Sequence, residues 1–470
     1  MVIALLLGLA ATYSAHADGR PPLSGGAPDT RSACTFWVAS TGGSDSNSGT
    51  SASQAFATLT HLRSALASTA QESKKVGCLT VGSSFTLTSA ITLTKTDNGE
   101  TWETDPAGPV NAATINGNGH IVFAYSEASN MTINGIKILG CGVACIANPN
   151  SSRRMSGNTI YASDISGNNG SGPGALQMSG VTWDNCVSCV IKNNYVHDTT
   201  GPGITLAAYQ AGESIDGSEI SGNVVIDACN ALSDCGAIYT NMFSTHGRGG
   251  SVTIKNNFIR GQGYATATDA IIGIYLDDTS SNVTVTGNIV GPPCAGCINT
   301  RSRNNASCFL INDDGYNGVP ATDTENDEFT GNICDLGASA MVQTGVLGGS
   351  GNSYTGNIVV SNFIGGLQTC TSGLCGYAYI ESKVAANLTL KDNLYVSNAP
   401  GGRVFFNGNS QGDSAPVTAT AAQLGCSGHL YALATTSVAY RPPVNFPRIA
   451  GHWGPPQFAI PVSINRSCTS

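Results

Sequence analysis

Charged residues are scarce in this chain. They make up 11% of its 470 residues, against 41% hydrophobic residues, and the formal net charge is -9. This composition is typical of neither a disordered nor a membrane-embedded protein, and the acidic excess argues against a nucleic-acid partner. Beyond the N-terminus no apolar run is long enough to cross a membrane. We therefore expect no membrane span and no nucleic-acid ligand.

Glycine, by contrast, is abundant. The chain holds 58 glycines, and Gly, Asn, Ser and Thr separate short apolar runs along most of its length. This texture favours many strands joined by tight turns over long helices. Because 470 residues are too many for one compact core, the fold must be elongated or repetitive.

The N-terminal stretch "MVIALLLGLAATYSAHADG" predicts a secretory signal. Its apolar run is short for a membrane span, and Ala15-His16-Ala17 forms an A-x-A cleavage site. No Lys or Arg precedes the apolar run, so a buried first strand is the alternative. We expect residues 1–17 to be removed and the mature protein to be secreted, either extracellular or periplasmic.

All 16 cysteines follow the predicted cleavage site, and their number is even. In an exported protein they predict disulfides that pin loops. Zinc is the alternative, because two of the close pairs have ligand spacing, Cys186 with Cys189 and Cys294 with Cys297. Connectivity cannot be read from sequence. The close pairs are Cys141 with Cys145, Cys186 with Cys189, Cys229 with Cys235, Cys294 with Cys297, and Cys370 with Cys375.

A short motif recurs: an apolar run, a Gly/Asn/Asp–Asn pair, then apolar-x-apolar. A residue that can take a left-handed conformation, followed by Asn, suits a corner between two strands, and stacked asparagines can hydrogen-bond in a ladder. Irregular steps between 25 and 44 residues indicate coils with loops of different length, a parallel β-helix signature; a β-propeller is the second choice. The motif asparagines are Asn158, Asn194, Asn223, Asn257, Asn288, Asn332, Asn357 and Asn393.

A second set of strands precedes these corners: "GALQM", "GITLA", "GAIYT", "GIYLDD", "CFLINDD" and "YAYIES". One coil then reads strand, turn, strand, Asn corner, strand, loop. The helical apolar face of residues 56–68 predicts a cap over the first coil, and the proline-rich tail loses the repeat. We predict an all-β, single-stranded parallel β-helix over residues 76–414, right-handed as the resemblance below implies, an N-terminal segment and capping helix over 18–75, and an irregular C-terminal tail over 415–470.

The segment "FWVASTGGSDSNSGTSASQAFATLTHL", with "DCGAIYT" and "GIYLDDTSSNVTVTGNIV", resembles secreted right-handed parallel β-helix, pectate-lyase-like carbohydrate-active proteins. In motif it is most similar to the β-helix glycoside hydrolases of the β-xylosidase-like and fucosidase/xylanase-like kind. The resemblance covers the mature chain as architecture, and residues 234–314 as a functional motif. It implies that carboxylates on one face act on a polysaccharide or its oligosaccharides. No Glu one coil beyond Asp277 completes an Asp/Glu pair.

Aligning the strands by their apolar pattern places residues 236–240 under 273–277, Asn312 over Asp277 and Asp313 over Asp278. Coils stack about 4.8 Å apart, so carboxylates at equivalent positions become neighbours and raise one another's pKa. Adjacent coils give nearly the retaining separation of two carboxyls, and two coils approach the inverting one. Asp277 or Asp278 is the predicted nucleophile or base, with Asp313 or Asp234 as the acid.

Other residues near this face are candidates for binding substrate. Tyr239 and Tyr275 could stack on sugar faces. Asp314 extends the acidic row, Arg301 and Arg303 lie in a loop that could overhang it, and His246 is either a proton shuttle or a loop residue. Any single Asp could instead only cap a turn.

Two other functions stay open. A polysaccharide lyase would use the acidic cluster to hold Ca²⁺ and a basic residue to abstract a proton. Its candidate bases are Arg248, Arg260, Arg301, Arg303 and Lys255. A non-catalytic carbohydrate-binding β-helix would show no turnover. For the hydrolase we expect no metal or other cofactor, and for the chain a monomer.

Overall fold

The structure is a computed structural model. It describes residues 30–71, 75–148, 153–167, 178–210, 212–242, 251–264, 271–291, 307–313, 324–336, 341–345 and 351–361, and the strands at 378–380, 388–391, 394–397 and 417–420. The predicted signal segment lies outside this part of the chain. Within it, no helix is long and apolar enough to cross a membrane.

Three long sheets, named A, B and C here, make up the molecule, and every strand pairing in them is parallel. Sheet A has 12 strands, in the order β1 (Phe36–Val38), β2 (Val76–Leu79), β5 (Thr101–Thr104), β8 (Thr132–Asn134), β12 (Thr159–Tyr161), β16 (Val190–Lys192), β19 (Glu219–Ser221), β22 (Val252–Lys255), β25 (Val283–Thr286), β28 (Glu328–Thr330), β31 (Asn352–Thr355) and β34 (Leu388–Lys391). Sheet B also has 12, in the order β3 (Ser84–Thr86), β6 (Thr114–Asn116), β9 (Lys137–Leu139), β13 (Asp164–Ser166), β17 (Tyr195–His197), β20 (Val224–Ile226), β23 (Phe258–Arg260), β26 (Ile289–Val290), β29 (Ile333–Leu336), β32 (Ile358–Ser361), β35 (Leu394–Ser397) and β36 (Val417–Thr420).

Sheet C has 10 strands, in the order β4 (Ile91–Thr94), β7 (Phe123–Ser126), β10 (Ile146–Ala147), β14 (Val181–Asp184), β18 (Ile204–Ala207), β21 (Cys235–Asn241), β24 (Ile271–Asp277), β27 (Ser307–Asp313), β30 (Met341–Gly345) and β33 (Ala378–Ile380). A two-stranded sheet pairs β11 (Met155–Ser156) with β15 (Cys186–Val187). Two short 3-10 helices, η1 (Ala52–Gln54) and η3 (Lys95–Asp97), and the helix α2 (Leu59–Ala67) complete the elements.

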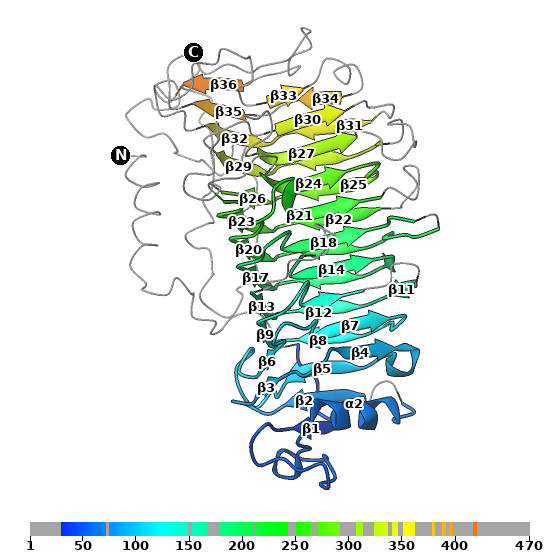
Figure 1. Ribbon diagram of the computed structural model, residues 1–470. Helices are drawn as coiled ribbons and strands as arrows, with labels where there is room; N and C mark the ends of the chain where they lie inside the picture. The colour runs from blue at the N-terminus through cyan, green and yellow to red at the C-terminus, as the bar shows by residue number, and fades with distance from the viewer. Residues whose placement is uncertain are drawn as a thin grey trace.

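Each coil of the chain visits the sheets in the order C, A, B and then steps up to the next coil, as Figure 1 shows for the stacked arrows from blue to yellow. The architecture is a right-handed parallel β-helix, which confirms the predicted fold class. Strand β36 pairs with β35, so a strand of sheet B lies beyond the predicted end of the β-helix at residue 414.

The strands alternate between inner and outer side chains, as short strands with one buried face do. On β22, Val252 and Ile254 are fully buried in the core, while Thr253 and Lys255 are half-buried on the outside. Equivalent inner residues of successive coils stack on one another and build one continuous apolar core along the axis. The outer face of each sheet is therefore a row of side chains repeated at the coil spacing.

A ladder of asparagines runs up the corner between sheets A and B. The Nδ2 groups of Asn194, Asn223, Asn257, Asn288 and Asn332 each donate to Oδ1 of the next asparagine, at 2.9 to 3.0 Å. The residue before each ladder asparagine has a left-handed backbone, for example Gly287 at φ 64°. The predicted corner is confirmed from Asn194 to Asn357.

Asn158 is not part of this ladder, contrary to the prediction. It precedes β12, where its Oδ1 accepts from the Met131 backbone N–H at 3.0 Å. Ser163 takes the ladder position of that coil, and its N–H donates to Asn194 Oδ1. The motif is similar at both corners because each needs a left-handed residue and a side-chain acceptor. Asn393 lies outside the described residues.

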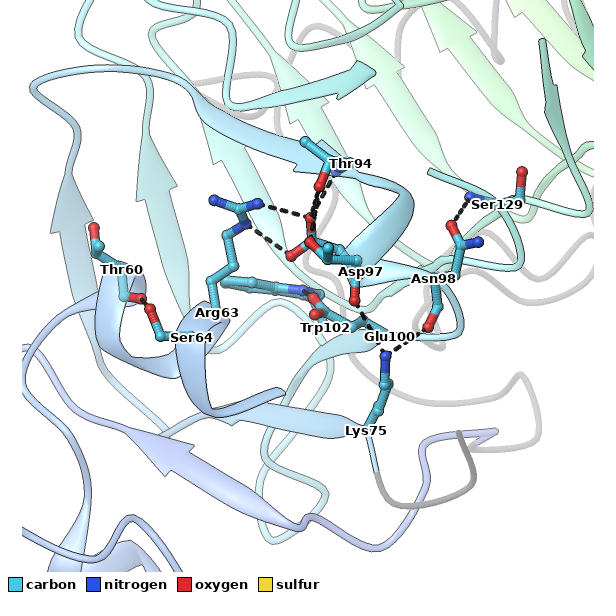
Figure 2. Close-up of polar contacts among 11 residues, drawn as sticks. Thr60, Arg63, Ser64, Lys75, Thr94, Asp97, Asn98, Glu100, Trp102 and Ser129 are labelled. Carbon is cyan, nitrogen blue, oxygen red and sulfur yellow. Dashed lines mark hydrogen bonds and ion pairs between the residues drawn. The ribbon is translucent and has the colours of Figure 1, made fainter. Parts of the chain in front are cut away.

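The helix α2 covers the first coil, as predicted. Thr58 caps its start by accepting from the His61 N–H, and its buried leucines Leu59, Leu62 and Leu66 pack on β1 and β2. Figure 2 shows the polar side of this cap, where Arg63 of α2 makes two hydrogen bonds to Asp97, at 2.8 and 2.7 Å. The helix thereby shields sheet edges that would otherwise be open at this end.

Five disulfides are described. Three join close pairs as predicted, Cys141–Cys145, Cys186–Cys189 and Cys229–Cys235. Two others join residues far apart in the sequence: Cys34–Cys78 connects the first two coils at sheet A, and Cys308–Cys334 connects sheets C and B within one coil. The zinc alternative is wrong for Cys186 and Cys189, because their sulfurs are bonded to each other. The pairs at 294/297 and 370/375 lie outside the described residues.

Candidate functional site

A column of polar residues runs up the outer face of sheet C where its strands end. Ala207 pairs with Asp184 on one side and Asn241 on the other, and Asn241 pairs with Asp277. Asn312 follows on the next coil, as predicted, and its Nδ2 lies 2.8 Å from Asp277 Oδ1. Carboxylates and amides from distant parts of the sequence thus share one edge.

The predicted register between β21 and β24 is wrong by one residue. Tyr239 pairs with Tyr275 and Asn241 with Asp277, whereas the alignment of Gly236 with Gly273 placed Thr240 under Asp277. The observed register stacks tyrosine on tyrosine outside the core and Ile238 on Ile274 inside it. A slip of one residue would send every side chain to the opposite face.

Asp277 is buried and firmly held. The Tyr239 hydroxyl donates to its Oδ2 at 2.6 Å, and Asn312 donates to its Oδ1. Burial, with a smaller contribution from the charge of Asp278, raises the pKa of Asp277 to about 7 despite these donors. This carboxyl therefore exchanges its proton near neutrality, as a general acid or base must.

Asp278 lies in the turn after β24 and is only half-buried. Its φ is 27° and that of Thr279 is 56°, so two successive residues with side chains have a left-handed backbone. Such strain is rare for a β-branched residue and is found most often at functional sites. The Asn241 amide lies 3.4 Å from Asp278 Oδ2 and 3.3 Å from the Tyr239 hydroxyl, which links the two carboxylates.

Asp234 is exposed, and Tyr275 connects it to the cluster around Asp277. The Tyr275 hydroxyl donates to Asp234 Oδ1 at 3.2 Å. Burial raises the pKa of Tyr275 well above its ordinary value, and the charges of Asp277 and Asp234 raise it further. Tyr239 and Tyr275 are both buried, and their rings meet edge to face with 5.2 Å between the ring centroids. Their hydroxyls make the described polar contacts, to Asp277 and Asp234.

Several predicted site residues are not placed by side chain. Asp313 ends β27 and its backbone pairs with Gly345, one position beyond Asn312. Asp314, His246, Arg248, Arg301 and Arg303 lie outside the described residues. Their roles stay predictions.

The two described candidates for a lyase base lie on other sheets. Lys255 ends β22 on sheet A, where its Nζ is 2.8 Å from Glu219 Oε2. Arg260 ends β23 on sheet B. Neither strand belongs to sheet C, which carries the carboxylates.

Three further residues of this edge were not predicted: Asp184, Tyr209 and Glu213. Burial raises the pKa of Asp184 to about 8, and the charge of Glu213 adds to the rise. The sequence predicts "GALQM" as the sheet C strand of this coil, whereas the described strand is β14, "VTWD". In β14, Val181 and Trp183 face the core and Asp184 faces out, an alternation that the sequence does show.

Among the described residues, no group of three or more His, Cys, Asp or Glu side chains is arranged to hold a metal ion. What the arrangement offers is a pair of carboxyls, Asp184 and Asp277, that change protonation close to neutral pH, with phenol and amide donors around the second. Carboxyl groups of this kind can act as general acids or bases.

No protein-family profile matches the chain, and no curated protein matches it. Among solved structures it is similar to a rhamnogalacturonan lyase, with 12% identity over 82% of this chain and 87% of the other and a TM-score of 0.43. Pectate lyase Pel9A is similar with 14% identity over 68% and 80% and a TM-score of 0.42. The catalytic domain of a GH87 alpha-1,3-glucanase is similar with 13% identity over 85% and 69% and a TM-score of 0.30.

The chain is similar to parallel β-helix carbohydrate-active proteins. The likeness concerns the fold, which the three parallel sheets show independently.

Proposed function

We propose that this protein is a secreted carbohydrate-active enzyme, and that it hydrolyses glycosidic bonds of a polysaccharide or its oligosaccharides at the Asp277–Asp278 end of sheet C. The observation that supports this is the Asp277 carboxyl, buried beside Asp278 with a pKa raised to about 7. A glycosidic oxygen needs a proton donor of this kind, and a second carboxylate beside it completes the usual pair.

The roles follow from the environments. Protonated Asp277 gives its proton to the glycosidic oxygen as the bond from that oxygen to the anomeric carbon breaks. A water molecule attacks the anomeric carbon and gives its proton to Asp278, which is half-exposed and can reach it. Tyr239 and Asn312 hold Asp277 in place. The sequence predicts Asp313 or Asp234 as the acid, but the raised pKa of Asp277 favours Asp277 for that role.

Polysaccharide lyases are more frequent than hydrolases among the similar structures reported above, and lyase action is the alternative that the sequence also suggested. The choice of hydrolysis therefore depends on the carboxyl chemistry of the site and must be tested directly against elimination. A lyase reaction would leave an unsaturated product that absorbs in the ultraviolet, and its calcium would be removed by EDTA.

The test is incubation of the purified protein with a polysaccharide panel, with and without EDTA, following reducing ends and ultraviolet absorbance together. We expect reducing ends without absorbance, insensitive to EDTA, and a loss of about 10²-fold or more in kcat for Asp277→Asn and Asp278→Asn. Glu328→Gln, on the exposed outer side of β28, is the matched control. Absorbance abolished by EDTA would establish the lyase instead, and no turnover of any substrate would favour a binding protein.

A further inference from the structure

Three polar atoms near the start of the carboxylate column are buried without a hydrogen-bond partner. They are Asp184 Oδ1, the Tyr209 hydroxyl and Glu213 Oε1. Asp184 and Glu213 are almost fully buried, at 2% and 3% exposure. Leaving a buried polar atom unpaired costs roughly 1–3 kcal/mol, so three such atoms in one place call for an explanation.

The fold brings these residues together. Asp184 ends β14, and Ala207, two residues before Tyr209, lies directly on it in the next coil. The loop after Tyr209 then turns back, because the Ser214 N–H donates to Asn185 Oδ1 at 3.1 Å, next to Asp184. Glu213 stays fixed in this loop through the Gln210 N–H, which donates to its Oε2 at 2.9 Å and leaves Oε1 without a partner.

The charges agree with this proximity. The Glu213 charge adds to the rise of the Asp184 pKa. Burial raises the pKa of Tyr209 far above its ordinary value, and the charges of Asp184, Asp277, Asp278 and Glu213 add to it in that order. The Tyr209 hydroxyl is thus close enough to these carboxyl groups for their charges to act on it, and it stays protonated as a donor.

We propose that Asp184, Tyr209 and Glu213 form a binding subsite for an uncharged sugar residue of the saccharide chain, away from the bond that is cleaved. This inference deepens the proposed function and rests on it. Each sugar hydroxyl both donates and accepts, so it can satisfy a phenol donor and a carboxylate acceptor at once. A uronate in this position would bring a further negative charge beside the Asp184 and Glu213 carboxyl groups, which is unfavourable.

The position of the subsite follows from the sheet. Strands β14, β18, β21 and β24 are consecutive in sheet C, so Asp184 and Asp277 are separated by three coil steps of about 4.8 Å each. A saccharide chain lying along the column would therefore reach the subsite only if it extends several sugar units from the reacting bond. Short oligosaccharides would not reach it.

The experiment is calorimetric titration of the Asp277→Asn protein with neutral xylo- and cello-oligosaccharides of two and six residues, and with oligogalacturonates of the same lengths. We expect the neutral hexasaccharide of one series to bind, and Tyr209→Phe to weaken it about threefold to tenfold, the worth of one hydrogen bond. Disaccharide binding should not change. Tyr161→Phe, on the outer side of sheet A, is the control, and thermal unfolding checks that each variant is folded.

Equal hexasaccharide affinity with and without the Tyr209 hydroxyl would overturn the subsite, as would tighter binding of the oligogalacturonates or no binding of any probe. Calcium binding that Asp184→Asn abolishes would replace the sugar with a cation and also overturn it. The two proposals can fail separately. If turnover is lost in Asp277→Asn but hexasaccharide affinity is unchanged in Tyr209→Phe, only the subsite proposal is wrong. If Tyr209→Phe weakens hexasaccharide binding but the wild type shows no turnover, only the hydrolase proposal is wrong.

Discussion

The hydroxyl of Tyr239 lies 2.6 Å from Oδ2 of Asp277, although 38 residues separate them in the chain. The contact exists because Tyr239 and Tyr275 stack at the same register position, which places Tyr239 one coil below Asp277 and on the same outer face. A donated hydrogen bond favours the charged carboxylate, so Tyr239 opposes the effect of burial on Asp277.

Replacing this donor should move the Asp277 titration. In Tyr239→Phe we expect the pKa of Asp277 to rise further above its present value of about 7, because one of the groups that lower it is gone. Carbon-13 NMR titration of the carboxyl measures this without any substrate. Tyr125→Phe, which removes a core hydroxyl that has no hydrogen-bond partner, should leave the titration unchanged. A downward shift in Tyr239→Phe would contradict the assigned contact.

His197 predicts a second pH effect, on stability. Its Nε2 lies 2.9 Å from Asp164 Oδ1 and its Nδ1 lies 2.6 Å from Asp198 Oδ2. Burial alone would lower the His197 pKa, but the two carboxylates outweigh it and raise the pKa. The stabilisation is therefore complete below the unfolded value of about 6.5 and is lost as the pH rises through the folded pKa.

The free energy of unfolding, measured by denaturant titration between pH 5 and 9, should fall across that window in the wild type by about 1.4 kcal/mol per unit of pKa shift. His197→Gln should flatten the fall. A wild-type profile with no fall above pH 6.5, or one that His197→Gln leaves intact, would contradict a charged His197. The other groups facing this site, Lys137 and Asp227, remain in both proteins.

Glu100 in the capping region gives a pH dependence of the same direction, through a carboxyl that resists ionisation rather than an imidazole held charged. Burial raises its pKa to about 8, although the Trp102 Nε1–H donates to it at 2.9 Å, as Figure 2 shows. A carboxyl that resists ionisation when folded weakens the fold as the pH rises from its ordinary value toward 8. Glu100→Gln should therefore be increasingly more stable than the wild type from pH 5 to 8. Thermal unfolding of both, with Glu328→Gln as the exposed control, measures the difference, and a constant gap would refute it.

The asparagine ladder should respond strongly to a single deletion. Asn257 donates to Asn288 Oδ1 and to the Ile220 carbonyl, and its Oδ1 accepts from Asn223. Asn257→Ala would leave these buried partners unpaired, at a cost of roughly 2–4 kcal/mol in the free energy of unfolding. Thr253→Ala, on the outer side of the neighbouring strand, should cost less than about 1 kcal/mol. Equal costs in denaturant titration would mean that the ladder contributes little.

Sequence reasoning identified the β-helix because its corners impose a local requirement. A left-handed residue followed by a buried amide acceptor is rare enough to be seen in the sequence wherever it recurs. The register of β21 on β24 was missed because Gly236 and Gly273 have no side chain to mark a face. Pairing Tyr239 with Tyr275 would have revealed it.

The subsite residues were harder to find for a different reason. Asp184 ends β14, a strand of four residues that follows "GALQM" closely, and the sequence predicts "GALQM" as the strand of this coil. Tyr209 and Glu213 lie in a loop that the hydrogen bond from the Ser214 N–H to Asn185 Oδ1 holds against the neighbouring coil. This contact is not part of the repeat pattern of the sequence, so the pattern does not predict it. Loop geometry of this kind depends on tertiary contacts.

The asparagine ladder also allows the length of the chain between successive corners to vary. Its rungs keep a length of 2.9 to 3.0 Å, although the chain between successive asparagines varies from 25 residues (Asn332 to Asn357) to 44 (Asn288 to Asn332). The geometry of the ladder therefore does not depend on the number of residues that each coil places between its corners. Segments bordering the carboxylate column can lengthen, shorten or be exchanged between coils while the strands of sheet C stay in alignment, so a new specificity can be grafted onto this scaffold without redesigning its core.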